Sequence, residues 1–172
     1  MSQTTRAVKA PEWMGHWGLR GLALRASLSS CSLERMQAMQ LEQAISRIIE
    51  REGEKAFSPG AYHLVREALD FTVARLAEQN EGESRHVSGT ELLHGFRDFC
   101  LKEYGPMSAT LLFDYGVQES VDVGKIVFQL IEEGVFGKQD SDTLEDFRGI
   151  YDFPETFTRP FQPEPETGED EA

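Results

Sequence analysis

The stretch from Arg85 to Phe153 constrains the fold most, because helix start and stop signals follow one another closely along it. Ser88 and Glu91 have the spacing of a capping box, in which each side chain accepts a hydrogen bond from the other residue's backbone amide. The Gly-Pro pair at 105–106 is expected to end the helix that Ser88 begins. Such closely spaced signals indicate several short helices with tight connections.

Apolar residues recur every three or four positions in five segments, which is the spacing of amphipathic helices. In one of these segments, Leu64, Ala68 and Phe71 face away from a second apolar face that holds Tyr62 and Leu69. A helix that is apolar on two sides is expected to lie between two layers of the protein. The predicted helices are residues 39–54, 59–79, 88–105, 106–115 and 120–133.

The pattern changes after residue 134. Apolar residues at 135–136 and again at 147–153 flank a charged stretch, which predicts two short strands around a loop with one helical turn between Ser141 and Asp146. Three helices followed by a hairpin is the plan of a winged-helix unit, with helix 120–133 in the recognition position. The sequence therefore predicts a mainly α protein, with about five helices ending in a short β-hairpin, in a winged-helix-like arrangement.

Charge divides the 172-residue chain unevenly. Residues 1–35 carry five basic and two acidic side chains, a net charge of +3, whereas residues 36–172 carry 12 basic and 28 acidic ones, a net charge of −16. This change indicates that 1–35 is either a disordered extension or the product of a misassigned start, with the native chain beginning at Met36 or Met39. Residues 36–153 are expected to form one helical domain, and the acidic, Pro-rich residues 154–172 a disordered tail.

The composition also limits what the chain can bind. A body this acidic repels phosphate backbones, so nucleic acid is a disfavoured partner, and anionic membrane surfaces are disfavoured for the same reason. No run approaches the roughly 18 apolar residues that span a bilayer. Cys31 and Cys100 have neither disulfide nor zinc-site spacing, and Cys100 is expected to be a buried, reduced thiol.

Five polar residues are the candidate binding surface: His63, Glu67, Glu91, His94 and Asp98. The Glu91-x-x-His94 spacing occurs on the ligand helices of di-iron bundles, but such a site needs the motif twice and two further glutamates. Because this chain has the motif once, no metal and no cofactor is predicted. A metal site that combines His63 and Glu67 with Glu91 and His94 is the remaining alternative.

No catalytic arrangement is recognisable, since the chain has neither a Gly-x-Ser-x-Gly elbow nor a phosphate-binding loop. The leading hypothesis is a non-enzymatic cytoplasmic protein-interaction module that contacts a partner through the polar strip of Glu91, His94 and Asp98. The alternatives are a winged-helix DNA-binding regulator and a metal-binding or enzymatic helical protein. DNA binding is disfavoured because helix 120–133 presents Lys125 alone against several carboxylates.

The segments RHVSGTELLHGFRDF, EYGPM, DYGV, GKIVFQLIEEG and EDFRGIYDF resemble a family of short acidic proteins of planctomycete and verrucomicrobial bacteria. The similarity extends over residues 61–153, just over half of the chain. Members of the family begin near the position of Met36, which supports the misassigned start, and carry tryptophan where this chain has Tyr115. The family has no assigned activity, cofactor or catalytic residue, so the resemblance implies a bacterial, cytoplasmic, single-domain protein and transfers no function.

Overall fold

The computed structural model of the chain describes residues 30–80, 85–137 and 143–162. In these residues it contains six α-helices and four short 3-10 helices, and no strand. The α-helices are α1 (Ser30–Glu52), α2 (Pro59–Gln79), α3 (Gly89–Tyr104), α4 (Ser108–Asp114), α5 (Ser120–Glu132) and α6 (Phe153–Thr158). The 3-10 helices are Gly53–Lys55, Gly105–Met107, Leu144–Phe147 and Arg159–Phe161. The prediction of a mainly α protein is therefore confirmed.

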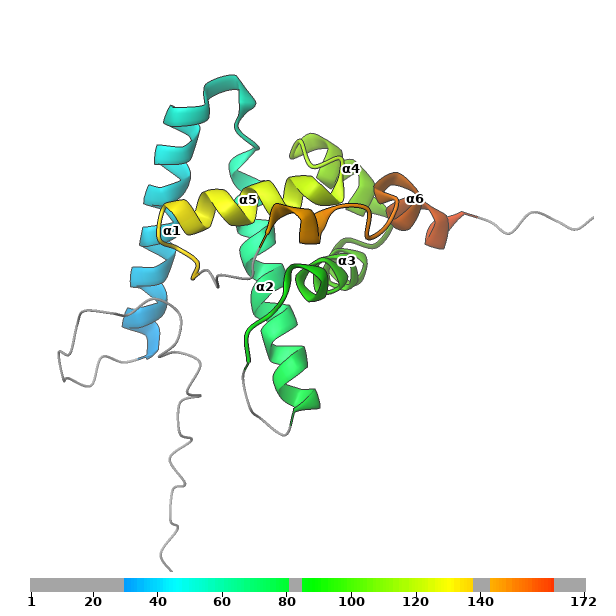
Figure 1. Cartoon of the computed structure of the whole chain (residues 1–172), viewed down its shortest axis with the longest axis horizontal. Coiled ribbons are helices and arrows are strands. Elements are labelled where there is room, and N and C mark those ends of the chain that lie inside the picture. The colour runs from blue at the N-terminus through cyan, green and yellow to red at the C-terminus, as the bar shows by residue number, and fades with distance from the viewer. Residues whose placement is uncertain (1–29, 81–84, 138–142, 163–172) are drawn as a thin grey trace, which may run out of the picture.

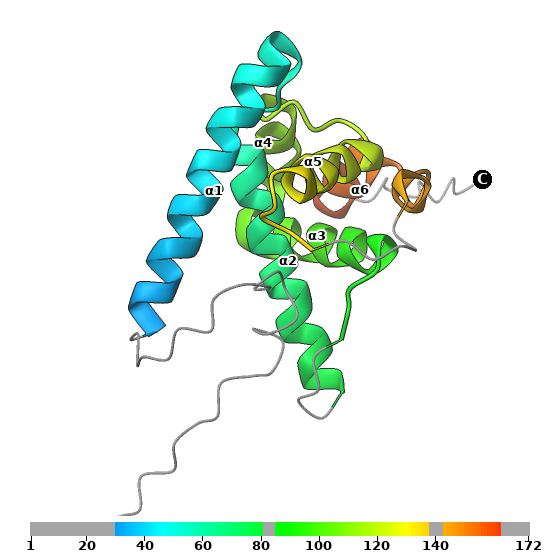
Figure 2. The ribbon, with the colours of Figure 1, turned by 60° about the vertical axis from the view of Figure 1, so that its left-hand side comes forward.

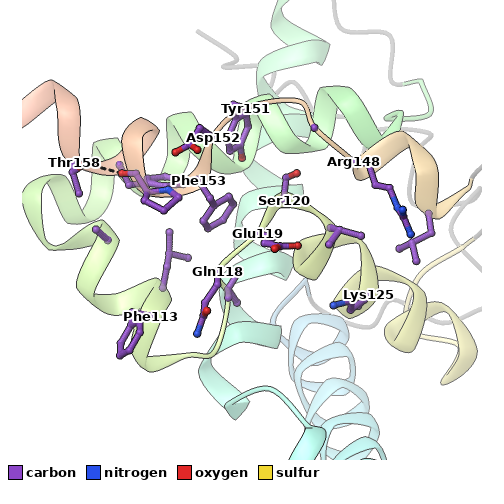
Figure 3. A pocket seen from close by; sticks show the side chains of 18 residues that line it. Phe113, Gln118, Glu119, Ser120, Lys125, Arg148, Tyr151, Asp152, Phe153 and Thr158 are labelled. Carbon is purple, nitrogen blue, oxygen red and sulfur yellow. Dashed lines mark hydrogen bonds between the residues drawn. The ribbon is translucent and has the colours of Figure 1, made fainter.

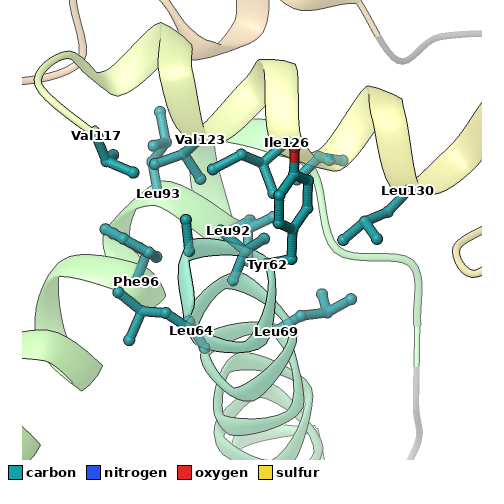
Figure 4. Close-up of a cluster of buried hydrophobic side chains, with 14 of the residues drawn as sticks. Tyr62, Leu64, Leu69, Leu92, Leu93, Phe96, Val117, Val123, Ile126 and Leu130 are labelled. Carbon is teal, nitrogen blue, oxygen red and sulfur yellow. The ribbon is translucent and has the colours of Figure 1, made fainter. Parts of the chain in front are cut away.

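Helix α2 lies in the middle of the fold and packs against both α3 and α5, as its two apolar faces predicted (Figure 1). Figure 4 shows the resulting core, in which side chains of α5 lie over side chains from α2 and α3. Tyr62 of α2 is fully buried there, and its hydroxyl donates a hydrogen bond to Gln129 Oε1 of α5 at 2.9 Å. The side chains of this core therefore come mainly from α2, α3 and α5, three of the helices that the sequence predicted.

Helix α1 packs against α5, and it lies on the opposite side of the molecule from α6 (Figure 2). Its buried face contains Leu41, Ala44, Ile45 and Ile48. Two ion pairs add to this contact, because Glu133 just after α5 meets both Arg47 Nε at 2.6 Å and Arg51 Nη1 at 3.1 Å. The helix begins at Ser30, so it includes residues 30–35, which the charge pattern had assigned to the extension.

The predicted helix ends agree with the observed ones to within two residues, except that α1 begins at Ser30, nine residues before the predicted start at residue 39. Ser88 and Glu91 form the capping box of α3, and Gly116 (φ +80°) and Gly134 (φ +74°) adopt the left-handed conformation that ends a helix. Pro59 is the first residue of α2. Ser58 occupies the N-cap position of that helix, but its side chain makes no capping hydrogen bond.

The predicted hairpin is wrong in the described residues. Val135 and Phe136 form a bend. Of the predicted second strand, Phe147 ends the 3-10 helix Leu144–Phe147, residues 148–151 form bends, and Phe153 begins α6. The reason is Phe147, which is 3% exposed and lies against Gly89 of α3 and Gly124 of α5, where a Cβ atom on either glycine would clash with its ring. This packing replaces pairing between strands, so no winged-helix arrangement is formed in the part of the chain that the structure describes.

The region after Phe153 also differs from the prediction of a tail. Asp152 Oδ1 accepts a hydrogen bond from the Glu155 amide at 2.9 Å and so caps α6, in which Phe157 is only 1% exposed. Phe157 packs against Phe153, with ring centroids 4.9 Å apart. The predictions for residues 1–29 and 163–172 lie outside the described residues.

Candidate functional site

The five polar residues predicted as a binding surface lie on two helices, α2 and α3. His63 on α2 faces α1, where its Nε2 atom lies 3.1 Å from Glu42 Oε1. Glu67, one turn further along α2, is exposed. The other three residues, Glu91, His94 and Asp98, lie on α3.

Glu91 is part of the start of α3. Its Oε2 atom accepts hydrogen bonds from the Ser88 amide and from Arg85 Nη1, each at 3.0 Å. The hydrogen bond from Arg85 is the largest of the effects that lower the pKa of Glu91 from 4.5 to about 2. The carboxylate is therefore already committed to the helix cap and to Arg85.

Asp98 is likewise paired within the protein. It accepts a hydrogen bond from Arg75 of α2 and another from Arg97 Nη2, the latter at 2.7 Å. Burial alone would raise the pKa of Asp98, but the bonds from Arg97 and Arg75 outweigh this effect and leave the pKa below its ordinary value. Of the three residues of the strip, His94 is the one that is exposed to solvent.

The metal-site alternative gains no support from this geometry. In the described part of the chain, no three His, Cys, Asp or Glu side chains lie close enough together to hold a metal ion. Cys100 is a free thiol and only 1% exposed, and burial raises its pKa well above the ordinary value. This confirms the prediction that it is buried and reduced, and such a thiol is a poor nucleophile.

A groove that the sequence did not predict lies between α4, the start of α5, the segment 144–152 and α6 (Figure 3). We call it the α4–α6 groove, and its volume is about 1030 Å³. The residues that line it are Ala109, Leu112, Phe113, Val117, Gln118, Glu119, Ser120, Val121, Lys125, Leu144, Arg148, Gly149, Tyr151, Asp152, Phe153, Pro154, Phe157 and Thr158.

The apolar part of the groove is held in place by the core. Val117, Phe153 and Phe157 are 1%, 5% and 1% exposed, and they form its buried floor. Ser120 Oγ donates a hydrogen bond to the Phe147 carbonyl at 2.7 Å, which attaches the 144–152 segment to the start of α5. Phe113 at the edge is 68% exposed, so this aromatic ring lies mostly in water.

Charged side chains surround this floor. Lys125 Nζ lies 2.7 Å from Asp122 Oδ1, and Arg148 Nε lies 3.3 Å from Glu145 Oε1. The sequence placed Asp122 on the outside of its helix, but it is only 8% exposed, because its Oδ2 atom accepts hydrogen bonds from the amides of residues 118 and 119. Both cations of the groove therefore already have carboxylate partners.

Ser120 at the start of α5 is 5% exposed and donates its hydroxyl hydrogen bond to the Phe147 carbonyl. One signal for the groove was present in the sequence: Leu111, Leu112 and Phe113 are consecutive in a short helix, so they cannot all face the core. Which of them faces solvent could not be read from that signal.

No family model, no curated protein and no solved structure is significantly similar to this chain. None of the helices in the described residues is long and apolar enough to cross a membrane.

Proposed function

We propose that the chain is a non-enzymatic protein-interaction module whose docking surface is the α4–α6 groove. The observation that carries this proposal is Phe113, which is 68% exposed at the edge of an apolar floor. Burying a side chain of this size yields roughly 1.5–3 kcal/mol, and aromatic anchors that fill pockets dominate the energetics of many interfaces. A partner segment that covers Phe113 would therefore gain affinity from a surface that is already formed.

The groove is a better candidate surface than the polar strip on α3. Two of the three strip residues, Glu91 and Asp98, already bind arginines of the same chain. A partner would have to replace those ion pairs, and exchanging one exposed ion pair for another yields little free energy. The groove, in contrast, has an aromatic side chain, Phe113, that is 68% exposed.

The alternative of a DNA-binding regulator is less well supported. Lys125 of α5 is paired with Asp122, and Glu132 and Glu133 at the end of that helix face the arginines of α1. A DNA duplex would therefore meet carboxylates, together with cations whose charge a neighbouring carboxylate already neutralises. A cytoplasmic location and membership of the acidic bacterial family are part of this proposal, on the grounds given by the sequence.

The proposal is tested by affinity purification of the tagged full chain from cells of its native host, with nuclease treatment and mass spectrometry. Wild type is compared with Phe113→Ala and with Met107→Ala, a matched control at a residue that is 62% exposed but does not line the groove. We expect a protein partner that survives nuclease and is about tenfold depleted with Phe113→Ala, the effect of losing about 1.4 kcal/mol of binding free energy. Met107→Ala is expected to retain it.

Two results would contradict the proposal. If every partner bound Phe113→Ala as well as wild type, the groove would not be the docking surface. If the partners disappeared after nuclease treatment, the DNA-binding alternative would replace it.

A further inference from the structure

The charges around the α4–α6 groove are predominantly negative. Lys125 and Arg148 are the cations that line it, and each already contacts a carboxylate, Asp122 and Glu145 respectively. Glu119 and Asp152 are two further lining carboxylates. The groove and its immediate partners therefore contain four carboxylates against two cations, and an acidic segment would be repelled.

Two exposed carboxylates lie on the segment that leads from Phe113 to the start of α5. Asp114 follows Phe113 at the end of α4 and is exposed, and Glu119 at the start of α5 lines the groove and is also exposed. No cation pairs with either of them in the described residues. An occupant that covers Phe113 and extends along this segment would meet two solvent-exposed carboxylates.

The charge of the rest of the molecule also favours a cationic partner. Within the described ranges, the basic side chains at 47, 51, 66, 75, 85, 97, 102, 125, 148 and 159 each lie within ion-pair distance of a carboxylate. The chain as a whole has a net charge of −13. Charges of this sign over a surface steer cationic segments towards it and slow the approach of anionic ones.

Building on the proposed function, we infer that the groove binds a cationic, apolar peptide segment of a partner protein. In this arrangement an apolar side chain covers Phe113, and a lysine or arginine next to it pairs with Asp114 or Glu119. The apolar contact supplies most of the affinity, and the charge pairs select the partner and speed association.

The test begins with a phage-displayed library of random dodecapeptides selected on the immobilised full chain. A parallel selection on Phe113→Ala identifies the clones that depend on the groove. We expect the Phe113-dependent clones to carry an apolar residue within a few positions of lysine or arginine. The most enriched sequence is then synthesised, and its Kd is measured by fluorescence anisotropy.

The measurement compares wild type with Asp114→Asn/Glu119→Gln and with the control Glu67→Gln/Glu78→Gln. The control removes the same charge from exposed positions of α2 outside the groove. We expect the groove variant to bind the peptide about fivefold more weakly, the size of effect of two solvent-exposed ion pairs, and the control to bind as wild type does. Circular dichroism of both variants verifies that the fold is retained.

The outcomes separate this inference from the function on which it rests. Phe113-dependent peptides without a basic residue, or equal weakening by both double variants, would overturn the cationic partner and leave the groove as a docking surface. A complete lack of Phe113-dependent peptides would overturn the docking surface itself. Dimerisation of wild type that Phe113→Ala abolishes, measured by light scattering, would make a second copy the occupant and would also overturn the inference.

Discussion

At the scale of single residues, the contact between α2 and α3 depends on Gly95. A Cβ atom at this position would lie 1.8 Å from Thr72 Oγ1, and Thr72 is fully buried with its hydroxyl bonded to the Ala68 carbonyl at 2.6 Å. Because Thr72 is fully buried, its side chain cannot move aside without disturbing the core. The distance between the two helices is therefore set by the absence of a side chain at one position.

We expect Gly95→Ala to lower the free energy of unfolding by about 2 kcal/mol, because overpacking outweighs the better helix propensity of alanine. Urea denaturation followed by circular dichroism measures this change. The double variant Thr72→Ala/Gly95→Ala is expected to lose less stability than the two single variants together, since Thr72 Oγ1, the atom nearest to the new Cβ, is removed. Strictly additive effects would show that the clash is absent.

The ionisation of Glu91 makes the stability of the start of α3 depend on pH. Its pKa is lowered from 4.5 to about 2 in the folded protein, so the ionised form favours folding. This contribution is complete above the unfolded pKa and is lost as the pH falls from about 4.5 towards 2. Acidification should therefore weaken the cap of α3 in that interval.

We expect Glu91→Gln to lower the free energy of unfolding by about 1 kcal/mol at pH 7, through loss of the charged contact with Arg85. The difference from wild type should shrink as the pH is lowered below about 4.5, because wild type then becomes neutral as well. Urea denaturation at a series of pH values provides the comparison, with exposed Glu67→Gln as control. A difference that stayed constant with pH would rule out the ionised carboxylate as its source.

At the scale of elements, α6 shows how a short helix can complete the core. It has six residues and contacts both α3 and α4, and its side chains supply part of the groove floor. Phe153 stacks on Phe96 of α3, with ring centroids 6.3 Å apart. The element is stabilised by these contacts, since a helix of this length has little stability by itself.

We expect Phe157→Ala to lower the free energy of unfolding by about 3–5 kcal/mol, because it leaves a cavity in the core. Phe161→Ala is the matched control: Phe161 is 43% exposed, and its loss should cost about 0.5 kcal/mol. Thermal or urea denaturation of the two variants makes the comparison. Equal effects would mean that α6 does not pack on the body in solution.

At the scale of the whole molecule, Cys100 reports on global unfolding. Its thiol is 1% exposed, and burial raises its pKa, so both access and ionisation oppose reaction in the folded state. It lies on α3, which packs against α2 and α5 as well as the short C-terminal elements. Opening that exposes this thiol should require most of the structure to unfold.

We expect Cys100 in a Cys31→Ser background to react with a thiol reagent at a rate that follows the population of the unfolded state. Adding Phe157→Ala should then accelerate labelling about a hundredfold, which corresponds to about 3 kcal/mol of lost stability. Mass spectrometry of the labelled protein measures the rate. Labelling that is unaffected by Phe157→Ala would indicate local opening around Cys100.

Several features of the fold could be predicted because they depend on neighbouring residues. The capping box at Ser88 and the end of α3 at Gly105 (φ +51°) each depend on residues within about one turn of that helix end. The segment after residue 134 could not be predicted in this way. A short apolar run fits a strand or a 3-10 turn equally well, and the space between Gly89 and Gly124 that receives Phe147 decides between them.

The candidate site was less accessible from sequence than the helices. His63, Glu67, Glu91, His94 and Asp98 were chosen because of their side-chain chemistry, but the partners of Glu91 and Asp98 could be identified only once α2 and α3 were packed. The run Leu111, Leu112 and Phe113 indicated that one of these side chains faces solvent, but only the structure identifies Phe113 as the exposed one.

The sequence by itself determined most of the ends of five helices, the capping box of α3 and the strongly acidic character of the chain. These properties follow from side-chain spacing within about four residues and from composition. The tertiary structure alone decided which aromatic residue remains in water and which charges are already paired. The reason is distance along the chain: residues 109 to 158 meet at the α4–α6 groove, and no local pattern specifies contacts between residues so far apart in sequence.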